Sequence, residues 1–480
     1  MLARLVVVLA ALTALATGTA SPVAAQGSAD GLDAVVEQEM SAAGVPGVAY
    51  AVVADGQPTS VGARGVRRLG EDDEVTPDTP FVIGSISKSF TALAVMQLGE
   101  AGELDLDTTL AETLDELADR PAADITTRQL LSHTSGFSTL QGNASYPRVE
   151  GRDALERRVA HLADVAPDHE PGERWEYSNL NYQLLGRVVE VVSGQAYDAY
   201  VAAHVLRPLG MTHSFVADGQ VHDEMATGHR PWFGTRRALA PGPTERVSAP
   251  QGGVVASAAD LARYLQTMMN GRDDVLSAEG KAQMMRPAGP ASPHYGLGWF
   301  VDPGSGQVWH GGTTPGVETL ATMRPDRGTG AVVLANAGSG IGFGETTQLL
   351  NAVTATALDL DYDGEGSRWS QKALYIALLL LPVGYLLSML WAWRHRGALR
   401  AKSGLAGRFS LWFPLLTTTA AAWVLLFLVP RLFGAPLATI RLFQPDLGLV
   451  LLAGAVTGVA WALLRLAVAH TGRTRPAEQT

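Results

Sequence analysis

The sequence contains no cysteine, and this absence limits both its structure and its chemistry. Without cysteine the chain cannot form a disulfide, use a thiolate nucleophile or bind a metal through sulfur. Charged residues are also scarce, at 17% of 480 residues, whereas hydrophobic residues make up 47%. This balance indicates that part of the chain lies in lipid, and the length indicates two or three structural units.

Positive charge is concentrated near the end of the chain. The net charge is −11, yet residues 372–480 contain two lysines and nine arginines against only Asp446 and Glu478. The preceding region is therefore strongly acidic, which argues against a nucleic-acid partner. The chain thus begins with an acidic module and ends with a basic, apolar one.

The first residues have the layout of a secretory signal peptide. A positive start at Arg4 precedes an apolar run over Leu5–Ala16, and small residues lead to a cleavage site after Ala25. An uncleaved membrane anchor is the alternative interpretation. Both interpretations place the following domain outside the cytoplasm.

Three apolar stretches near the end of the chain are each close to the ~20 residues that cross a bilayer. The positive residues between the first two predict that this loop and the C-terminal tail lie in the cytoplasm, by the positive-inside rule. This orientation agrees with the signal peptide, so we expect a bacterial membrane protein whose large domain is extracytoplasmic. The stretches are Ala373–Trp393, Ser410–Val429 and Leu447–His470.

Residues 30–360 show a mixed pattern of strands and helices. Short β-type runs bounded by turn residues occur at Val48–Val53 and Ala331–Asn336. Amphipathic helices are predicted at Ser87–Glu100, Leu180–Ser193 and Ala258–Met269. The predicted organisation is a signal peptide over 1–25, an α/β (α+β) domain over 26–362, a linker over 363–371 and a membrane region over 372–480.

The first motif with chemical meaning joins Ser85 and Lys88. A turn delivers Ser85 to the start of a helix, and Lys88 follows one turn later on the same face. A serine hydroxyl needs a neighbouring base to act as a nucleophile, and a lysine with a lowered pKa can supply it. The chain has only four lysines, and Lys88 lies in an apolar neighbourhood, where lysine is unusual. Ser85 and Lys88 are therefore candidate catalytic residues.

Two further segments fit the same chemistry. Tyr177 is a candidate to share the general-base role with Lys88, and Asn179 offers an amide that can both donate and accept hydrogen bonds. His310, Gly311, Gly312 and Thr313 form a glycine-rich stretch at a strand border. There a substrate can lie along the strand edge, and a backbone N–H can face a developing oxyanion.

Other hydrolase and nucleotide motifs are absent from the sequence. It contains no Gly-x-Ser-x-Gly elbow, no His-Glu-x-x-His zinc motif and no phosphate loop. We therefore expect no cofactor and no metal. His133 lies next to Ser132, but a structural role is the favoured interpretation.

In this order and spacing the motifs resemble those of the serine β-lactamase and DD-peptidase superfamily. The similarity is to the class C-like branch, which includes esterases and D-aminopeptidases, and it covers most of residues 30–345. Supporting segments are 125–136, 207–211 and 295–299. The resemblance implies an antiparallel sheet flanked by helices, a helical lobe inserted after the nucleophile helix, and an oxyanion hole formed by the N–H groups of Ser85 and Thr313.

The third motif departs from the pattern of true β-lactamases. They usually have Lys-Thr-Gly where this chain has His310-Gly311-Gly312. The missing lysine and threonine hydroxyl help to hold a substrate carboxylate, so efficient β-lactamase activity is disfavoured, although Thr313 or Thr314 is a candidate replacement. Ester and D-amino-acid peptide substrates both remain open.

The interpretation of the whole sequence is a membrane-tethered serine hydrolase that forms an acyl-enzyme on Ser85. Its partners would be a small-molecule or peptide acyl substrate and the lipid bilayer. The alternative is a catalytically idle binding or sensory module, since three spans exceed what tethering requires. The intact serine, lysine and tyrosine argue against that alternative, because an idle pocket has no chemical need for them.

Overall fold

The structure is a computed structural model that describes residues 29–341 and 345–471. The predicted signal peptide over 1–25 lies outside the described residues. The described chain forms two compact units, one up to Gly366 and one from Ser367 onward. This division falls within the stretch 363–371 that the sequence analysis predicts as a linker, and each unit is described by itself below.

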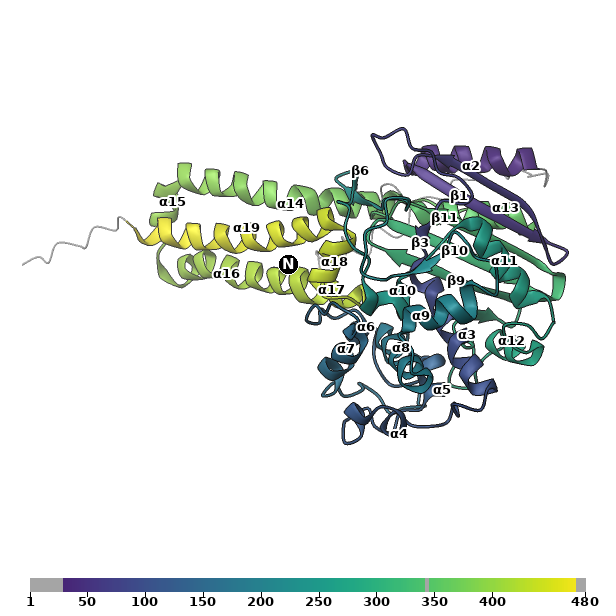
Figure 1. Cartoon of the computed structure of the whole chain (residues 1–480). Coiled ribbons are helices and arrows are strands. Elements are labelled where there is room, and N and C mark those ends of the chain that lie inside the picture. The colour runs from purple at the N-terminus through teal and green to yellow at the C-terminus, as the bar shows by residue number, and fades with distance from the viewer. Residues whose placement is uncertain (1–28, 342–344, 472–480) are drawn as a thin grey trace, which may run out of the picture. The chain divides into compact units, whose positions relative to one another are not determined.

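A six-stranded antiparallel sheet forms the centre of the first unit, with strand order β2-β1-β11-β10-β9-β8 (Figure 1). Neighbouring strands are antiparallel throughout, so Tyr50 of β1 pairs with Val333 of β11 and Leu320 of β10 pairs with Gly311 of β9. The strands are β1 Gly47–Ala54, β2 Gln57–Gly65, β8 Phe300–Asp302, β9 Gln307–Thr314, β10 Val317–Arg324 and β11 Thr329–Ala335.

Side chains that alternate along β1 and β11 bury both faces of this sheet. Tyr50 and Val333 belong to a core cluster with helices α2 (Ala29–Ala43) and α13 (Thr346–Leu358). The residues directly before and after Tyr50 and Val333 in the sequence belong to the larger core on the opposite face, beneath α11 (Ala258–Met269). Figure 1 shows α2 and α13 together along the sheet. The alternation follows from the two-residue period of a β-strand.

A helical lobe follows α3 in the chain and packs against it through α8. Three of its short helices begin with a serine or threonine capping box, among them the one capped by Thr126, whose hydroxyl accepts from the Gln129 N–H. Its helices are α4 Leu110–Thr113, α5 Thr127–Leu131, α6 Thr139–Gly142, α7 Ala154–Leu162, α8 Asn179–Ser193 and α9 Tyr197–Val201.

Two small sheets complete the first unit. One has the order β3-β7-β4, and the other pairs β5 with β6. The strands are β3 Phe81–Val82, β4 Phe215–Val216, β5 His229–Trp232, β6 Thr235–Ala238 and β7 Val254–Ala256.

Helix α3 spans Ser87–Glu100, as predicted, but it is not amphipathic. Residues on all of its sides are buried, including Ser87, Lys88, Phe90 and Leu93. The reason is that α3 contacts α8, α10 (Ala249–Gly252) and α12 (Ala278–Met284), so it runs through the interior of the unit. A helix that is enclosed on all sides has no solvent face to carry polar residues.

The second unit is helical, and its described residues include three helices long and apolar enough to cross a membrane. These candidate spans are Trp369–Arg394 (α14), Gly404–Leu432 (α16 to α17) and Pro445–His470 (α19). α19 packs against both of the others, and its Gly454 and Gly458 let Leu381 and Tyr385 of α14 approach closely. Short helices connect the spans, namely α15 Arg396–Arg400 and α18 Leu437–Phe443.

Candidate active site

Ser85 lies in a single 3-10 turn, Gly84–Ile86, between β3 and α3. Gly84 adopts a φ of +55°, a conformation that favours glycine. A Cβ at this position would lie 2.6 Å from the backbone nitrogen of Thr313. Glycine therefore allows the turn that carries Ser85 to pack directly against β9.

Lys88 follows in the first turn of α3 and is fully buried. Its Nζ lies 3.1 Å from Ser85 Oγ, 2.8 Å from Asn179 Oδ1 and 2.8 Å from the main-chain oxygen of Gln251. Burial lowers the pKa of Lys88 well below its ordinary value. A neutral amine has two N–H groups and one lone pair. The two carbonyl oxygens can only accept, so they leave the lone pair for the Ser85 hydroxyl.

Tyr177 flanks this pair from the segment just before α8. The Lys88 Nζ lies 4.9 Å from the centre of the Tyr177 ring. The enclosure of the phenol by protein raises its pKa, and an interaction with the Ser85 hydroxyl opposes part of that rise. The His133 ring packs against the Tyr177 ring with 4.4 Å between their centres. Burial therefore favours the neutral form of both groups: Lys88 loses its proton and can act as a base, whereas Tyr177 keeps its proton.

His133 has a structural role, as the sequence analysis favours. It is buried with a φ of +58°, and its Nδ1 faces the N–H of Ser178 at 3.2 Å and the Asn181 amide at 2.9 Å. These contacts fix the imidazole beside Tyr177 and tie it to the segment that enters α8. His133 thus positions the tyrosine without a hydrogen bond to Ser85 or Lys88 among the described residues.

The glycine-rich segment forms the second half of β9, where one strand edge is open. β8 pairs with β9 only as far as Trp309, whereas β10 pairs with it through Thr314. Among the described residues no strand covers the outer edge of 310–314. A Cβ on Gly312 would lie 1.9 Å from the carbonyl oxygen of Ile83, so this glycine is required for β9 to approach the Ser85 turn.

His310 belongs to this segment of β9, but its side chain is buried and does not extend from the open edge. It is buried, its Nδ1 contacts the carbonyl oxygen of Gly311 at 2.6 Å, and its Nε2 contacts the Tyr295 hydroxyl at 3.2 Å. Burial, helped by the nearby Lys88, lowers the pKa of His310 to about 3. The imidazole is therefore neutral near pH 7 and offers no positive charge to a substrate carboxylate.

The structure thus brings the predicted residues of all three segments to one place. Ser85, Lys88 and Asn179 are linked by hydrogen bonds, Tyr177 covers the amine, and the backbone of Gly312 and Thr313 abuts Gly84. Sequence reasoning missed the Gln251 carbonyl, since a main-chain acceptor has no sequence signature. It also missed the contact between His310 and Tyr295, although residues 295–299 stood out as a family segment.

Comparison with known proteins shows the family of the chain. The Beta-lactamase family model matches residues 32–356, which is more than half of the chain. The chain belongs to the Beta-lactamase family. Penicillin-binding protein 4 of Amycolatopsis lactamdurans is 34% identical over 325 residues, covering 62% of this chain and 83% of that protein. Protein flp of Staphylococcus aureus (strain MRSA252) is 25% identical over 426 residues, covering 84% of this chain and 83% of flp.

Solved structures show the same Beta-lactamase fold. The octameric penicillin-binding protein homologue from Pyrococcus abyssi has a TM-score of 0.59 at 27% identity, covering 69% of this chain and 77% of that one. The SurE crystal structure has a TM-score of 0.59 at 28% identity, covering 69% of this chain and 77% of SurE. A class C β-lactamase is 20% identical with a TM-score of 0.58, and the match covers 72% of this chain and 100% of that protein. At this identity it supports the fold alone.

Proposed function

We propose that this chain is a membrane-tethered, extracytoplasmic serine hydrolase that cleaves ester or amide bonds through an acyl-enzyme on Ser85. The observation that carries the proposal is the buried Lys88 amine, whose neighbours are the Ser85 hydroxyl and two carbonyl oxygens. An amine that is kept neutral and aimed at a serine is what activation of that serine requires. Membership of the Beta-lactamase family supports the same reaction class.

The first step forms the acyl-enzyme. Lys88 Nζ takes the proton from Ser85 Oγ while Oγ bonds to the substrate carbonyl carbon, and the carbonyl π electrons move onto oxygen. As the tetrahedral intermediate collapses, the bond to the leaving group breaks. The leaving atom receives a proton from Lys88, relayed through the Tyr177 hydroxyl. Asn179 holds the amine in position throughout, since its Oδ1 accepts from Nζ.

The developing oxyanion would be stabilised by the backbone N–H groups of Ser85 and Thr313. Gly84 and Gly312 support this role because they let the serine turn and β9 approach each other within contact distance. In the second step a water oxygen bonds to the acyl carbon while its proton passes to the Lys88 and Tyr177 pair. The bond between that carbon and Ser85 Oγ then breaks, Oγ takes the proton back, and the released acid loses its remaining proton to solvent. Backbone donors placed in advance need no reorganisation during the reaction.

The substrate we propose has no carboxylate beside the scissile bond on the β9 side. The side chain there is neutral His310, and Gly311 and Gly312 add no hydroxyl. Small esters and D-amino-acid amides or peptides fit this surface better than β-lactams that depend on carboxylate recognition. The SurE crystal structure with D-Leu supports D-amino-acid chemistry, and the relative named Penicillin-binding protein 4 keeps a β-lactam in the test below.

The membrane location rests on the three long apolar helices and on the charges that flank them. Arg396, Arg400 and Lys402 lie on the connection between the first two candidate spans, and Arg394 and Arg408 lie at the adjoining ends of those spans, which favours a cytoplasmic position for that loop. The Ser85 site would then face outward, where wall peptides and exogenous esters are found.

A substrate panel tests this function on the full chain in detergent. The panel comprises a nitrophenyl ester of a short fatty acid, a nitroanilide of a D-amino acid, a D-alanyl-D-alanine peptide and a chromogenic cephalosporin. We expect turnover of the ester or of the D-amino-acid amide, and slower turnover of the cephalosporin. Ser85→Ala should abolish every activity. Fast cephalosporin hydrolysis would overturn the substrate assignment, and activity in the alanine variant would overturn the mechanism.

A further inference from the structure

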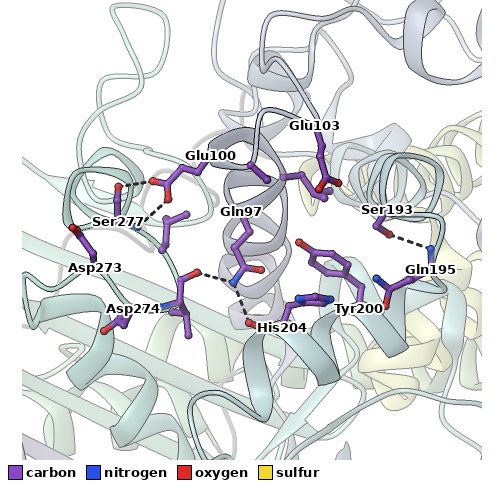
Figure 2. Close-up of a pocket in the computed structure, with 14 residues that line it drawn as sticks. Gln97, Glu100, Glu103, Ser193, Gln195, Tyr200, His204, Asp273, Asp274 and Ser277 are labelled. Atoms are coloured by element: carbon purple, nitrogen blue, oxygen red, sulfur yellow. Dashed lines mark hydrogen bonds between the residues drawn. The ribbon is translucent and has the colours of Figure 1, made fainter.

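An open cavity lies at the far end of the helix that carries Lys88. It has a volume of about 640 Å³, within the range of small-molecule sites, and its lining includes Gln97 and Glu100 of α3 (Figure 2). Lys88 and Gln97 are nine residues apart on one helix, which corresponds to about 14 Å along its axis. The cavity is therefore separate from the Ser85 site.

The side chains that line this cavity carry only negative formal charge. They include four carboxylates and neither lysine nor arginine. Glu100 accepts hydrogen bonds from the N–H and hydroxyl of Ser277, neither of which carries a positive charge, and Asp274 pairs with Lys281 from outside the lining. The Glu103 carboxylate has no hydrogen bond or ion pair with any described residue. The remaining carboxylate is Asp273.

Tyr200 supplies an independent sign of a ligand. Its side chain is only 5% exposed, yet its hydroxyl has no hydrogen-bond partner among the described residues. Figure 2 shows this hydroxyl pointing into the space between Gln97 and Glu103. The hydroxyl is thus the polar tip of a largely buried side chain and opens onto the cavity, where a ligand can pair with it. The Tyr200 ring stacks on His204 with 4.4 Å between centres, which gives the cavity a flat aromatic wall.

The end of α3 adds to the negative potential of the cavity. The helix ends at Glu100, and the negative end of its dipole lies there, although the N–H groups of Ala101 and Gly102 pair with the carbonyl oxygens of Gln97 and Gly99. An ammonium group there would meet the Glu103 carboxylate, the Tyr200 hydroxyl oxygen and the helix end together. Its alkyl chain could lie along the aromatic wall.

We propose that this cavity is a binding site for an organic cation with a primary ammonium group. The site is distinct from the hydrolase site, and the proposal does not depend on the function proposed for Ser85.

Calorimetry tests the proposal. The full chain in nanodiscs is titrated with three probes of equal length. The probes are 1,5-diaminopentane, pentane-1,5-diol and glutarate, which carry positive, no and negative charge. We expect binding of the diamine alone, weakening as salt is added because the carboxylates are partly exposed. Glu103→Gln should weaken binding by up to about fivefold, the upper end of what one exposed charge pair contributes.

Two variants separate this site from general surface charge. Tyr200→Phe removes only the hydroxyl and should also weaken diamine binding. Asp164→Asn removes an exposed carboxylate elsewhere on the same unit, where it pairs with Arg120, and should leave binding unchanged. Equal affinity in wild type and Glu103→Gln, or an equal loss in Asp164→Asn, would overturn the proposal. So would failure of the wild type to bind the diamine at millimolar concentration.

Discussion

Lys88 is a buried amine whose hydrogen-bond neighbours are all oxygen atoms, from Ser85, Asn179 and Gln251. None of the three carries a negative charge that would hold the amine in its protonated form. Burial without a counter-charge is the strongest way to lower the pKa of a lysine. At the residue scale, the proposed chemistry therefore rests on the absence of a carboxylate as much as on the presence of the lysine.

Replacing Lys88 by arginine tests whether the amine acts as a base. Arginine keeps the positive charge but does not release its proton, so kcat should fall by roughly 10³-fold. Lys281→Arg is the matched control: Lys281 is also buried, but it pairs with Asp274 and should contribute nothing to turnover. Thermal unfolding of both variants checks that they are folded. A loss of less than about tenfold in Lys88→Arg would show that charge alone is needed there.

The pH dependence of kcat/KM should report Lys88 and not His310. Activity should rise with pH as Lys88 loses its proton, because only the neutral amine is a base, and the midpoint should lie below the ordinary pKa of lysine. His310 has a pKa of about 3 and stays neutral across that range. His310→Gln should therefore keep the midpoint of the acid limb. Disappearance of the limb in this variant would assign the base role to the histidine.

Most residues of the candidate site could be predicted from the sequence because each belongs to a short motif with its own chemical meaning. Ser85, Lys88, Tyr177 and Asn179 were selected in this way, and the structure places them together. The Gln251 carbonyl and the packing of His133 on Tyr177 were not predicted. Both depend on backbone positions brought together by folding, which no local pattern records.

At the scale of elements, the site depends on the close approach of the serine turn and β9. Gly84 and Gly312 face each other across this contact, and neither could carry a side chain without displacing the backbone opposite. Helices α3 and α11 were predicted at their observed bounds, since apolar residues recur at helical spacing. The burial of α3 on all sides was not predicted, because periodicity does not reveal how many neighbours an element has.

Two neighbouring glycines of β9 provide a matched test of this contact. Gly312→Ala should lower the melting temperature by roughly 5 °C or more, because the added methyl would meet the Ile83 oxygen at 1.9 Å. Gly311→Ala should leave it nearly unchanged, since the nearest atom to its Cβ, the Thr319 oxygen, is 3.7 Å away. Circular dichroism of both variants measures the difference. Equal melting temperatures would show that β9 does not rely on this glycine.

At the scale of the whole molecule, the chain joins a Beta-lactamase unit to a helical unit with three candidate spans. Hydropathy alone located the three candidate spans to within six residues at each end, because about twenty apolar residues in a row have few other uses. The side of the membrane on which each loop lies rests on charge and stays a prediction.

The absence of native cysteine makes that topology directly testable. Single cysteines can be introduced at three exposed positions, Asp164, Ser403 and Ala438, and treated with a membrane-impermeant maleimide in intact cells. We expect labelling of Asp164→Cys and Ala438→Cys in intact cells, and of Ser403→Cys only after lysis. Labelling of Ser403→Cys in intact cells would reverse the proposed orientation. The wild-type chain is a background-free control.

The most direct test of the central claim is covalent labelling of the full chain with a fluorophosphonate, followed by tryptic peptide mapping. Cleavage after Arg68 and Lys88 isolates residues 69–88, which contain Ser85 and Ser87, and fragment ions distinguish the two. The account predicts one adduct, on Ser85, and none in Ser85→Ala. An unlabelled wild-type chain would contradict it and favour the catalytically idle binding module. An adduct that persists in Ser85→Ala would contradict it by showing that another residue is the nucleophile.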